Sequence, residues 1–279
     1  MERTIDIENS RDELNEWVRK SVELFESSQY LDKIAEVYPL QTAHPERLED
    51  GLRRRIISAH QGRRTNELIE ILINEVKFPY DEPIWYLFKN IQGCLENNPN
   101  QIQRIADSLY AMTAEETVVR LESAPKLNTQ MGPMFTNWLR AEFNLLDIDD
   151  FRNSTKGIFI LNASEGEALN FVRNGLHQDL DKRPDLLAKV DETYVIGEAK
   201  WIGSPGGNQN KQVVEVINLC KKQRGNVIRV GIIDGFPWAI YKTNGTIIND
   251  KTCVMVQECE YDILSALLLR EYLEAFLTV

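Results

Sequence analysis

Two acidic residues and a lysine in the second half of the chain have the types and spacing that suggest chemistry. Asp185 follows a proline, and after an interval of twelve residues Glu198 and Lys200 stand two positions apart. On a strand, Glu198 and Lys200 point to one face, and a hairpin of residues 183–190 and 193–201 brings Asp185 beside them. Two carboxylates at one strand end can hold Mg²⁺ together with water and phosphate. The ion lowers the pKa of a water and neutralises a phosphodiester, and Lys200 can orient that water or stabilise developing negative charge.

The alternative interpretation of these residues is an edge strand on which Glu198 and Lys200 form a solvated pair. The apolar pairs Val195-Ile196 and Trp201-Ile202 favour burial instead, and burying charges without a purpose is costly. Glu75-Val-Lys77 repeats the spacing, but it lies in a helical pattern, where positions i and i+2 point to nearly opposite sides. Only the strand-borne pair is therefore kept as a candidate site.

The elements that must position this site are indicated by the pattern after residue 126. Periodicity predicts a helix over 133–146, and Ser164-Glu-Gly-Glu167 has the form of a cap that opens a short helix ending near residue 172. Runs rich in apolar and β-branched residues predict strands. The predicted strands are 157–163, 183–190, 193–201, 226–234 and 237–243, and further helices are predicted over 209–224 and 263–276. This alternation is typical of an α/β fold.

The first 125 residues have a different character, because their apolar residues recur at three and four positions. Turn signals at 38–39, 61–62, 78–79 and 97–99 separate the helical segments. Thr113-Ala-Glu-Glu116 has the form of a capping box that opens a further helix. We therefore expect an all-helical region over residues 1–125, followed by an α/β domain over residues 126–279 that carries the candidate site.

Composition sets the broad class of the protein. The 279 residues are 43% hydrophobic and 27% charged, which is ordinary for a globular protein and excludes a disordered or fibrous chain. The net charge of −11 argues at first against a nucleic-acid partner. Most of this charge, −8, belongs to the first 125 residues, and the second part is nearly balanced. A local cleft can therefore still attract an anion.

The cysteines and the apolar runs bear on the compartment. Four scattered cysteines without a C-x-x-C motif, together with three isolated histidines, argue against a zinc site. No apolar run approaches the roughly 20 residues of a membrane helix, and the first residues lack the pattern of a secretory signal. We therefore expect a cytoplasmic protein with reduced thiols and no membrane partner.

Pro184-Asp185 and Glu198-Ala199-Lys200 match the PD…(D/E)xK signature, and on these residues the chain resembles the restriction-endonuclease-like nucleases. The predicted order of elements is similar to their shared core, a central mixed sheet flanked by helices. Segments 201–213 and 232–241 look like type II restriction endonucleases in particular, because a glycine-rich turn follows the catalytic strand and a D-G-x-x-W element comes later. The resemblance covers roughly residues 130–245.

The resemblance implies a role for each residue of the signature. Asp185 and Glu198 would be ligands of the metal ion, with the backbone carbonyl of Ala199 as a third ligand. Lys200 would assist the attacking water. The cofactor implied is Mg²⁺.

Two further positions are compared with the family's pattern. Many members carry another acidic ligand from an earlier element, for which Glu165 and Glu167 are the candidates. The alternative is that both only favour the N-terminus of their own helix. The family's early helix often carries a glutamate, whereas this chain has Thr136 or Asn137 at the plausible position.

The segment 203–211, directly after the catalytic strand, is the best candidate for contact with DNA. Its glycines allow close approach of the backbone, amide groups at a helix N-terminus favour a phosphate, and amide side chains can pair with adenine. The alternative is a strand-to-helix loop with polar capping residues. The candidate contacts are Ser204, Asn208, Gln209, Asn210 and Lys211.

Two basic clusters are further candidates for contact with the DNA backbone. Lys182 and Arg183 stand just before Pro184, near the expected scissile phosphate. Arginines at 53–55 and at Arg63 and Arg64 stand out in an acidic region and can clamp phosphates. The alternative for this second cluster is a helix face balanced by the acidic residues at positions 46–50.

We therefore expect a Mg²⁺-dependent type II restriction endonuclease that cleaves both strands of duplex DNA at a short site and leaves 5′-phosphate and 3′-hydroxyl ends. A palindromic site calls for two symmetry-related active sites, so a homodimer is expected. The helical region would grip DNA or build the dimer. Two alternatives stay open: a repair, recombination or transposition nuclease with the same core, and a non-catalytic DNA-binding protein with a structural Glu198–Lys200 pair.

Overall fold

The computed structural model describes residues 3–7, 9–27, 29–39, 47–76, 82, 84–122, 131–222 and 225–278. The chain divides into two compact units, and each is discontinuous in sequence. The sheet unit comprises Met1–Phe25, Met131–Trp238 and Asn249–Val279, and the helical unit comprises Glu26–Gln130 and Ala239–Ile248. This division differs from a single boundary at residue 125, because the first helix packs in the sheet unit and a short later segment packs in the helical unit.

The helical unit has the character that its periodicity predicts. The described residues between 29 and 122 form helices and turns apart from an isolated β-bridge between Ile91 and Lys242. The helices are α2 (Tyr30–Val37), α3 (Asp50–Gln61), α4 (Thr65–Glu75), α5 (Trp85–Asn90), α6 (Pro99–Tyr110) and α7 (Ala114–Leu121). The predicted capping box is present, because the Thr113 hydroxyl accepts from the Glu116 N–H and the Glu116 carboxylate accepts from the Thr113 N–H. The turn predicted at 78–79 lies outside the described residues.

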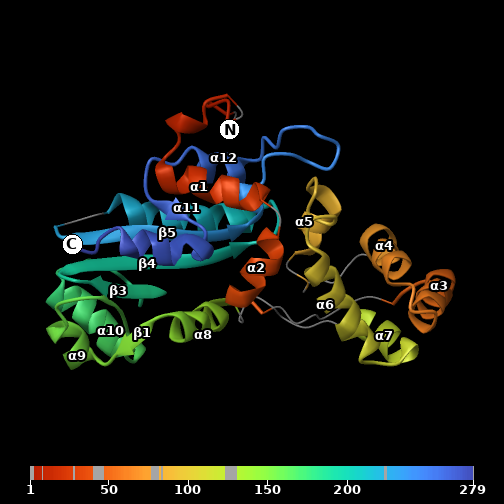
Figure 1. Cartoon of the computed structure of the whole chain (residues 1–279), viewed down its shortest axis with the longest axis horizontal. Coiled ribbons are helices and arrows are strands. Elements are labelled where there is room, and N and C mark those ends of the chain that lie inside the picture. Colours follow the sequence, from red (N-terminus) through yellow and green to blue (C-terminus); the bar gives the residue numbers. More distant parts are fainter. Residues whose placement is uncertain are drawn as a thin grey trace. The chain divides into compact units, whose positions relative to one another are not determined.

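The sheet unit is built on a six-stranded mixed sheet in the order β1-β2-β3-β4-β5-β6 (Figure 1). Its strands are β1 (Asn144–Leu146), β2 (Ile158–Leu161), β3 (Leu186–Val190), β4 (Thr193–Ile202), β5 (Val227–Gly235) and β6 (Ile263–Leu264). The β2–β3 and β3–β4 pairs are antiparallel, whereas β1–β2, β4–β5 and β5–β6 are parallel. Helices alternating with these strands confirm the predicted α/β class.

Helices pack against the sheet and fix its strands (Figure 1). Those of the sheet unit are α1 (Glu16–Glu26), α8 (Met131–Glu142), α9 (Ile148–Asn153), α10 (Glu165–Asn170), α11 (Gly207–Lys221), α12 (Lys251–Gln257) and α13 (Leu269–Glu274). The buried Phe151, Phe171, Leu187 and Ile196 form a core between α9, the turn after α10, and the β3–β4 hairpin. Helix α1 joins this unit through Trp17, whose ring packs edge-on against Tyr272 at 5.0 Å.

The structure corrects the predicted elements at three places. The predicted helix over 133–146 ends at Glu142, and residues 144–146 instead form β1, which pairs with β2. The predicted strand over 237–243 is wrong, because Phe236–Trp238 form a 3₁₀ turn in which the indole N–H of Trp238 donates to the Ile233 carbonyl at 2.7 Å. The segment over 263–276 begins with β6 and becomes α-helical at Leu269. Pairing with a neighbouring strand overrides local preference in the first case, and a local side-chain hydrogen bond does so in the second.

The last features of the fold concern the state of the cysteines and the character of the longest helices. All four cysteines are free and buried. Among the described residues, no helix combines the length and the apolar composition that crossing a membrane would need.

Candidate active site

The β3–β4 hairpin brings the two predicted carboxylates together. Leu186 pairs with Gly197 in the antiparallel register, so the next pair outward places Asp185 opposite Glu198. Residues directly opposite each other in such a pair point to the same face of the sheet. The hairpin closes at Asp191, whose φ of 50° belongs to the left-handed region that aspartate tolerates. The twelve-residue interval in the sequence is therefore the length of one tight hairpin.

Asp185 is held at the start of β3 by the backbone of β4. Its Oδ2 accepts a hydrogen bond from the N–H of Ala199 at 2.9 Å. Burial raises the pKa of the Asp185 carboxyl, and the negative charge of Glu198 adds to this rise. The Ala199 N–H, Lys200 and Lys182 lower the pKa, but they do not cancel the rise. The negative charge of Glu198 thus acts on Asp185 in the same direction as burial.

Glu198 is almost entirely buried and accepts hydrogen bonds from two lysines. Its side chain is 7% exposed, and its Oε1 accepts from Lys200 Nζ at 2.6 Å and also from Lys182 Nζ. Burial lowers the pKa of Lys182, but the hydrogen bond and the negative charges of Glu198, Asp185 and Glu215 outweigh it, so that the pKa is raised. Two lysine side chains thus contact this buried carboxylate, which would be costly to bury without such partners.

Close packing behind the candidate site fixes the position of β4, which carries Glu198 and Lys200, against its neighbours. A Cβ at Gly197 would lie 3.1 Å from Val230 Cγ1 and 3.2 Å from Leu186 Cβ, so no larger side chain fits without movement. Gly231 on β5, which pairs with Glu198, is closer still to its neighbour, because a Cβ there would lie 2.5 Å from Val216 Cγ1 on α11. The glycines at 197 and 231, which flank Glu198 along its strand and across the sheet, are thus required by the packing of the sheet.

The donor set of the site fits a hard divalent cation. Asp185 and Glu198 supply carboxylate oxygens, which such ions prefer, and both lie at one end of the hairpin. Within the described residues, however, no three His, Cys, Asp or Glu side chains gather around one point. The structure therefore does not bring Glu165 or Glu167 to the pair. Glu167 instead accepts hydrogen bonds from the N–H and hydroxyl of Ser164 and caps its own helix, which also lowers the pKa of its carboxyl.

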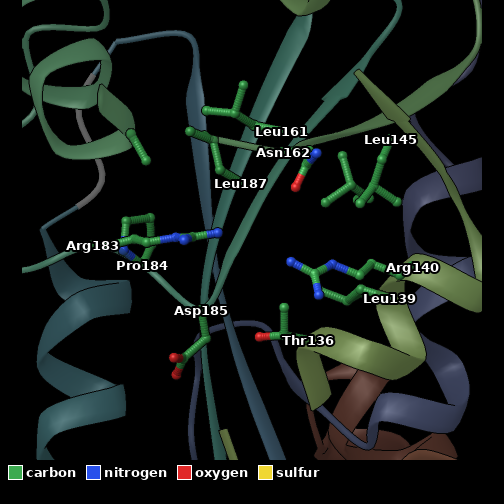
Figure 2. A pocket seen from close by; sticks show the side chains of 12 residues that line it. Thr136, Leu139, Arg140, Leu145, Leu161, Asn162, Arg183, Pro184, Asp185 and Leu187 are labelled. Atoms are coloured by element: carbon green, nitrogen blue, oxygen red, sulfur yellow. The ribbon is translucent and has the colours of Figure 1, made fainter. Parts of the chain in front are cut away.

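A hollow opens beside Asp185 between α8 and the strands β1, β2 and β3 (Figure 2). Thr136, at the position compared with the family's early glutamate, lines this hollow and donates its hydroxyl to the Gly132 carbonyl at 3.1 Å. Arg183 lines the hollow as well and donates to the carbonyl of Ala163 at 3.1 Å. Arg140 on α8 completes the set of charged residues there. Arg140 could not be selected from the sequence, because an isolated arginine on an amphipathic helix carries no motif.

The loop after β4 presents only part of the predicted DNA-contacting set to solvent. Asn208 and Lys211 are exposed, while Ser204, Gln209 and Asn210 are half-buried. Asn210 Oδ1 accepts from the Thr252 hydroxyl and so joins α11 to α12. Gln209 has a buried Oε1 without a hydrogen-bond partner among the described residues. Asn208 and Lys211 are therefore the most exposed of the five predicted contact residues.

The arginines of the helical unit are mostly paired with acids. Arg53 binds Glu122, Arg55 binds Glu75, and Arg64 binds Glu67 and the hydroxyl of Ser58. Arg63 has a φ of 51° and stacks over the ring of Tyr110, with its guanidinium carbon 4.5 Å from the ring centroid. The carboxylates that pair with these arginines are thus Glu122, Glu75 and Glu67, and not the acidic residues at positions 46–50.

Comparison with known proteins identifies the family. The model of the family described as Tsp45I type II restriction enzyme matches residues 15–276, a span that includes Asp185, Glu198 and Lys200. The searches of the curated proteins and of the solved structures found no match. The mixed sheet with its flanking helices is consistent with a restriction-endonuclease-like fold. The chain therefore belongs to the Tsp45I type II restriction enzyme family, and it is a site-specific deoxyribonuclease of a restriction system.

Proposed function

We propose that this restriction endonuclease uses Mg²⁺ to cleave both strands of duplex DNA at a short site, with Asp185, Glu198 and Lys200 as its active site. The observation that carries the proposal is the hairpin register, which sets Asp185 opposite Glu198. In addition, Lys200 donates a hydrogen bond to Glu198 Oε1, so all three side chains belong to one cluster. Type II restriction enzymes generally use divalent metal ions, and a pair of carboxylates is a suitable donor set for Mg²⁺.

The metal ligands in this proposal are the carboxylates of Asp185 and Glu198 and the backbone carbonyl of Ala199. When bound, Mg²⁺ would act as a Lewis acid that neutralises charge on the phosphodiester and makes a water more acidic. The raised pKa of Asp185 supports this assignment, because a carboxylate crowded by burial and by a like charge gains most from an added cation.

Lys200 has the position of a group that assists the attacking water. Its Nζ lies 2.6 Å from Glu198 Oε1, so it can donate to a water or phosphate oxygen held at that carboxylate. Attack of the water oxygen on phosphorus forms one P–O bond and breaks the bond to the 3′ oxygen, which takes up a proton. The products are a 5′-phosphate and a 3′-hydroxyl.

Contacts with the duplex are proposed for residues around this site. Lys182 and Arg183 precede β3 and would meet the backbone of the cleaved strand, and Asn208 and Lys211 at the start of α11 would reach toward the groove. We further propose that the protein acts in the cytoplasm as a homodimer, since a palindromic site requires two active sites. The helical unit, with Arg63, would contribute to the grip on DNA or to the dimer.

Substitution of the three residues tests the proposal. Asp185→Ala and Lys200→Ala are expected to reduce cleavage of plasmid DNA in Mg²⁺ by at least about a hundredfold, because each removes a group acting on the transition state. Lys222→Ala, which changes an exposed lysine just after α11, is the matched control and should give the discrete bands of the wild-type protein. Calorimetric titration with Mg²⁺ should show weaker binding for Glu198→Ala. Cleavage at the wild-type rate by either of the first two variants would contradict the site assignment.

A further inference from the structure

Two arginines that belong to different elements face each other across the hollow beside the active site. Arg140 extends from α8 and Arg183 from the segment that precedes β3, and both line the same hollow. Figure 2 shows their guanidinium groups entering it from opposite walls, with Asp185 at one edge. The hollow therefore shares a wall with the candidate metal site.

Neither arginine has a carboxylate partner within the part of the chain that the structure describes. Arg183 donates to the Ala163 carbonyl, and Arg140 makes a long contact of 3.5 Å with Asn137 Oδ1. Arginines elsewhere are paired differently, as Arg19 with Glu23 and Arg270 with Glu142. Two cations that share a hollow repel each other unless an anion lies between them.

The walls of the hollow strengthen the attraction for such an anion. Leu139, Leu145, Leu161 and Leu187 line it, and apolar walls lower the local dielectric constant. Asn162, an exposed residue on the rim, adds a polar side chain. Guanidinium groups bind phosphate oxygens in pairs, so two of them suit a tetrahedral phosphate diester.

We propose that Arg140 and Arg183 bind a DNA backbone phosphate next to the scissile one, on the strand being cut. The proposal rests on the proposed function. Asp185 belongs both to the hollow and to the proposed metal site, and this places the phosphate in the hollow beside the reacting one. A strand held both at the reacting phosphate and at this neighbouring phosphate is kept in register with the two carboxylates. Arg140 is thus a positioning residue, and its effect belongs to DNA binding.

The salt dependence of DNA affinity in EDTA tests the contact without any cleavage. In Arg140→Gln the affinity for a duplex carrying the mapped cleavage site should fall about tenfold, and the slope of log K against log salt should decrease by about 0.9. Arg140→Lys keeps the charge and should keep the slope. Arg19→Gln removes an equal charge from a salt-bridged arginine outside the hollow and should match the wild type.

Neutral methylphosphonate linkages identify the phosphate that is bound. In Mg²⁺ and in the Lys200→Ala background, one methylphosphonate beside the cleavage point should weaken binding about tenfold, and adding Arg140→Gln should weaken it no further. Arg183→Gln should show the same insensitivity, with its melting temperature recorded because Arg183 also binds the Ala163 carbonyl.

Two outcomes would overturn the proposal. One is an Arg140→Gln protein with the affinity and salt slope of Arg19→Gln, and the other is full additivity of the substitution with every flanking methylphosphonate. Failure of the proposed function gives a different result, since it would be seen as cleavage by the Lys200→Ala protein. The salt slope in EDTA decides on Arg140 in either case.

Discussion

The carboxylates of Asp185 and Glu198 accept hydrogen bonds from donors in three directions. The N–H of Ala199 supports Asp185, while Lys200 and Lys182 support Glu198. These donors do not fully offset burial and mutual repulsion at Asp185, whose carboxyl keeps a raised pKa. A cation bound at this pair, as proposed for Mg²⁺, would offset that burial and repulsion.

Asp191 gives a prediction about acid stability. Its carboxylate accepts from the Gly157 N–H and from the N–H and hydroxyl of Thr278, and these bonds, that of the Thr278 hydroxyl first, lower its pKa from 3.8 to about 2. A depressed carboxyl pKa stabilises the fold above the unfolded-state pKa, and this contribution is lost as the pH falls through the folded-state value. The difference in unfolding free energy between wild type and Asp191→Asn should therefore be constant above about pH 5 and shrink between about pH 4 and 2.

The measurement is urea unfolding at a series of pH values. Asp179→Asn is the control, because Asp179 is an exposed aspartate without such donors among the described residues. A difference for Asp191→Asn that stays the same down to pH 2 would show that the three hydrogen bonds do not favour the charged form.

At the scale of residues, sequence pattern finds groups that share a strand and misses groups that meet across elements. The pair Glu198 and Lys200 is visible because alternation on a strand puts both on one face. Asp185 is visible because one hairpin joins it to them. Arg140 and Arg183 line one hollow only because α8 packs beside the sheet. The contact of Lys182 with Glu198 depends on the path of the chain before β3.

The contact between α11 and the sheet positions β4, which carries Glu198 and Lys200, and depends on one glycine. Helix α11 lies against β4 and β5, and a Cβ at Gly231 would meet Val216 Cγ1 at 2.5 Å and Ile263 Cγ1 at 3.1 Å. Gly231→Ala is expected to destabilise the protein by about 1–3 kcal/mol, since the helix must move away from the strand that pairs with Glu198. Chemical denaturation measures this change.

Gly166 provides the matched control for that substitution. It lies in α10 with nothing within 4 Å of an added Cβ, so Gly166→Ala should stabilise the protein by up to about 1 kcal/mol through helix propensity. Equal effects of the two substitutions would contradict the role given to the contact between α11 and β5.

The start of α11 carries two proposed DNA contacts, Asn208 and Lys211, beside Asn210, which makes a structural hydrogen bond. Lys211→Ala should weaken binding equally for all DNA sequences and reduce the salt slope by about 0.9, as expected for a phosphate contact. Asn208→Ala should instead relax sequence preference, as expected for a base contact. Asn210→Ala should mainly lower the melting temperature, because Asn210 binds Thr252. Binding titrations and melting curves of the three variants measure these effects, and a melting temperature lowered equally in all three would count against contact with DNA.

At the scale of elements, long periodic segments are predictable and short ones depend on their partners. Strand β4 and helix α11 lie within two or three residues of their predicted ranges. The three residues of β1 continue the apolar pattern of α8, and only pairing with β2 makes them a strand. The run 237–243 has strand composition, but the Trp238 indole closes a turn onto the Ile233 carbonyl.

At the scale of the whole molecule, the proposed homodimer predicts the mass of the species that cuts. Sedimentation equilibrium should give twice the 32.2 kDa of one chain. In a duplex with one recognition site, both strands should be cleaved during a single binding event. A monomeric mass at concentrations that give full activity, with or without DNA, would contradict the homodimer.

The chain enters the sheet unit, leaves it, returns, leaves again and comes back once more, because both units are assembled from separated stretches. No single break in the gene therefore yields an intact half. An engineer who wishes to exchange one unit for its counterpart from another protein would have to transplant several stretches at once, and a fragment that begins at residue 126 would lack the first helix, whose Trp17 packs on Tyr272.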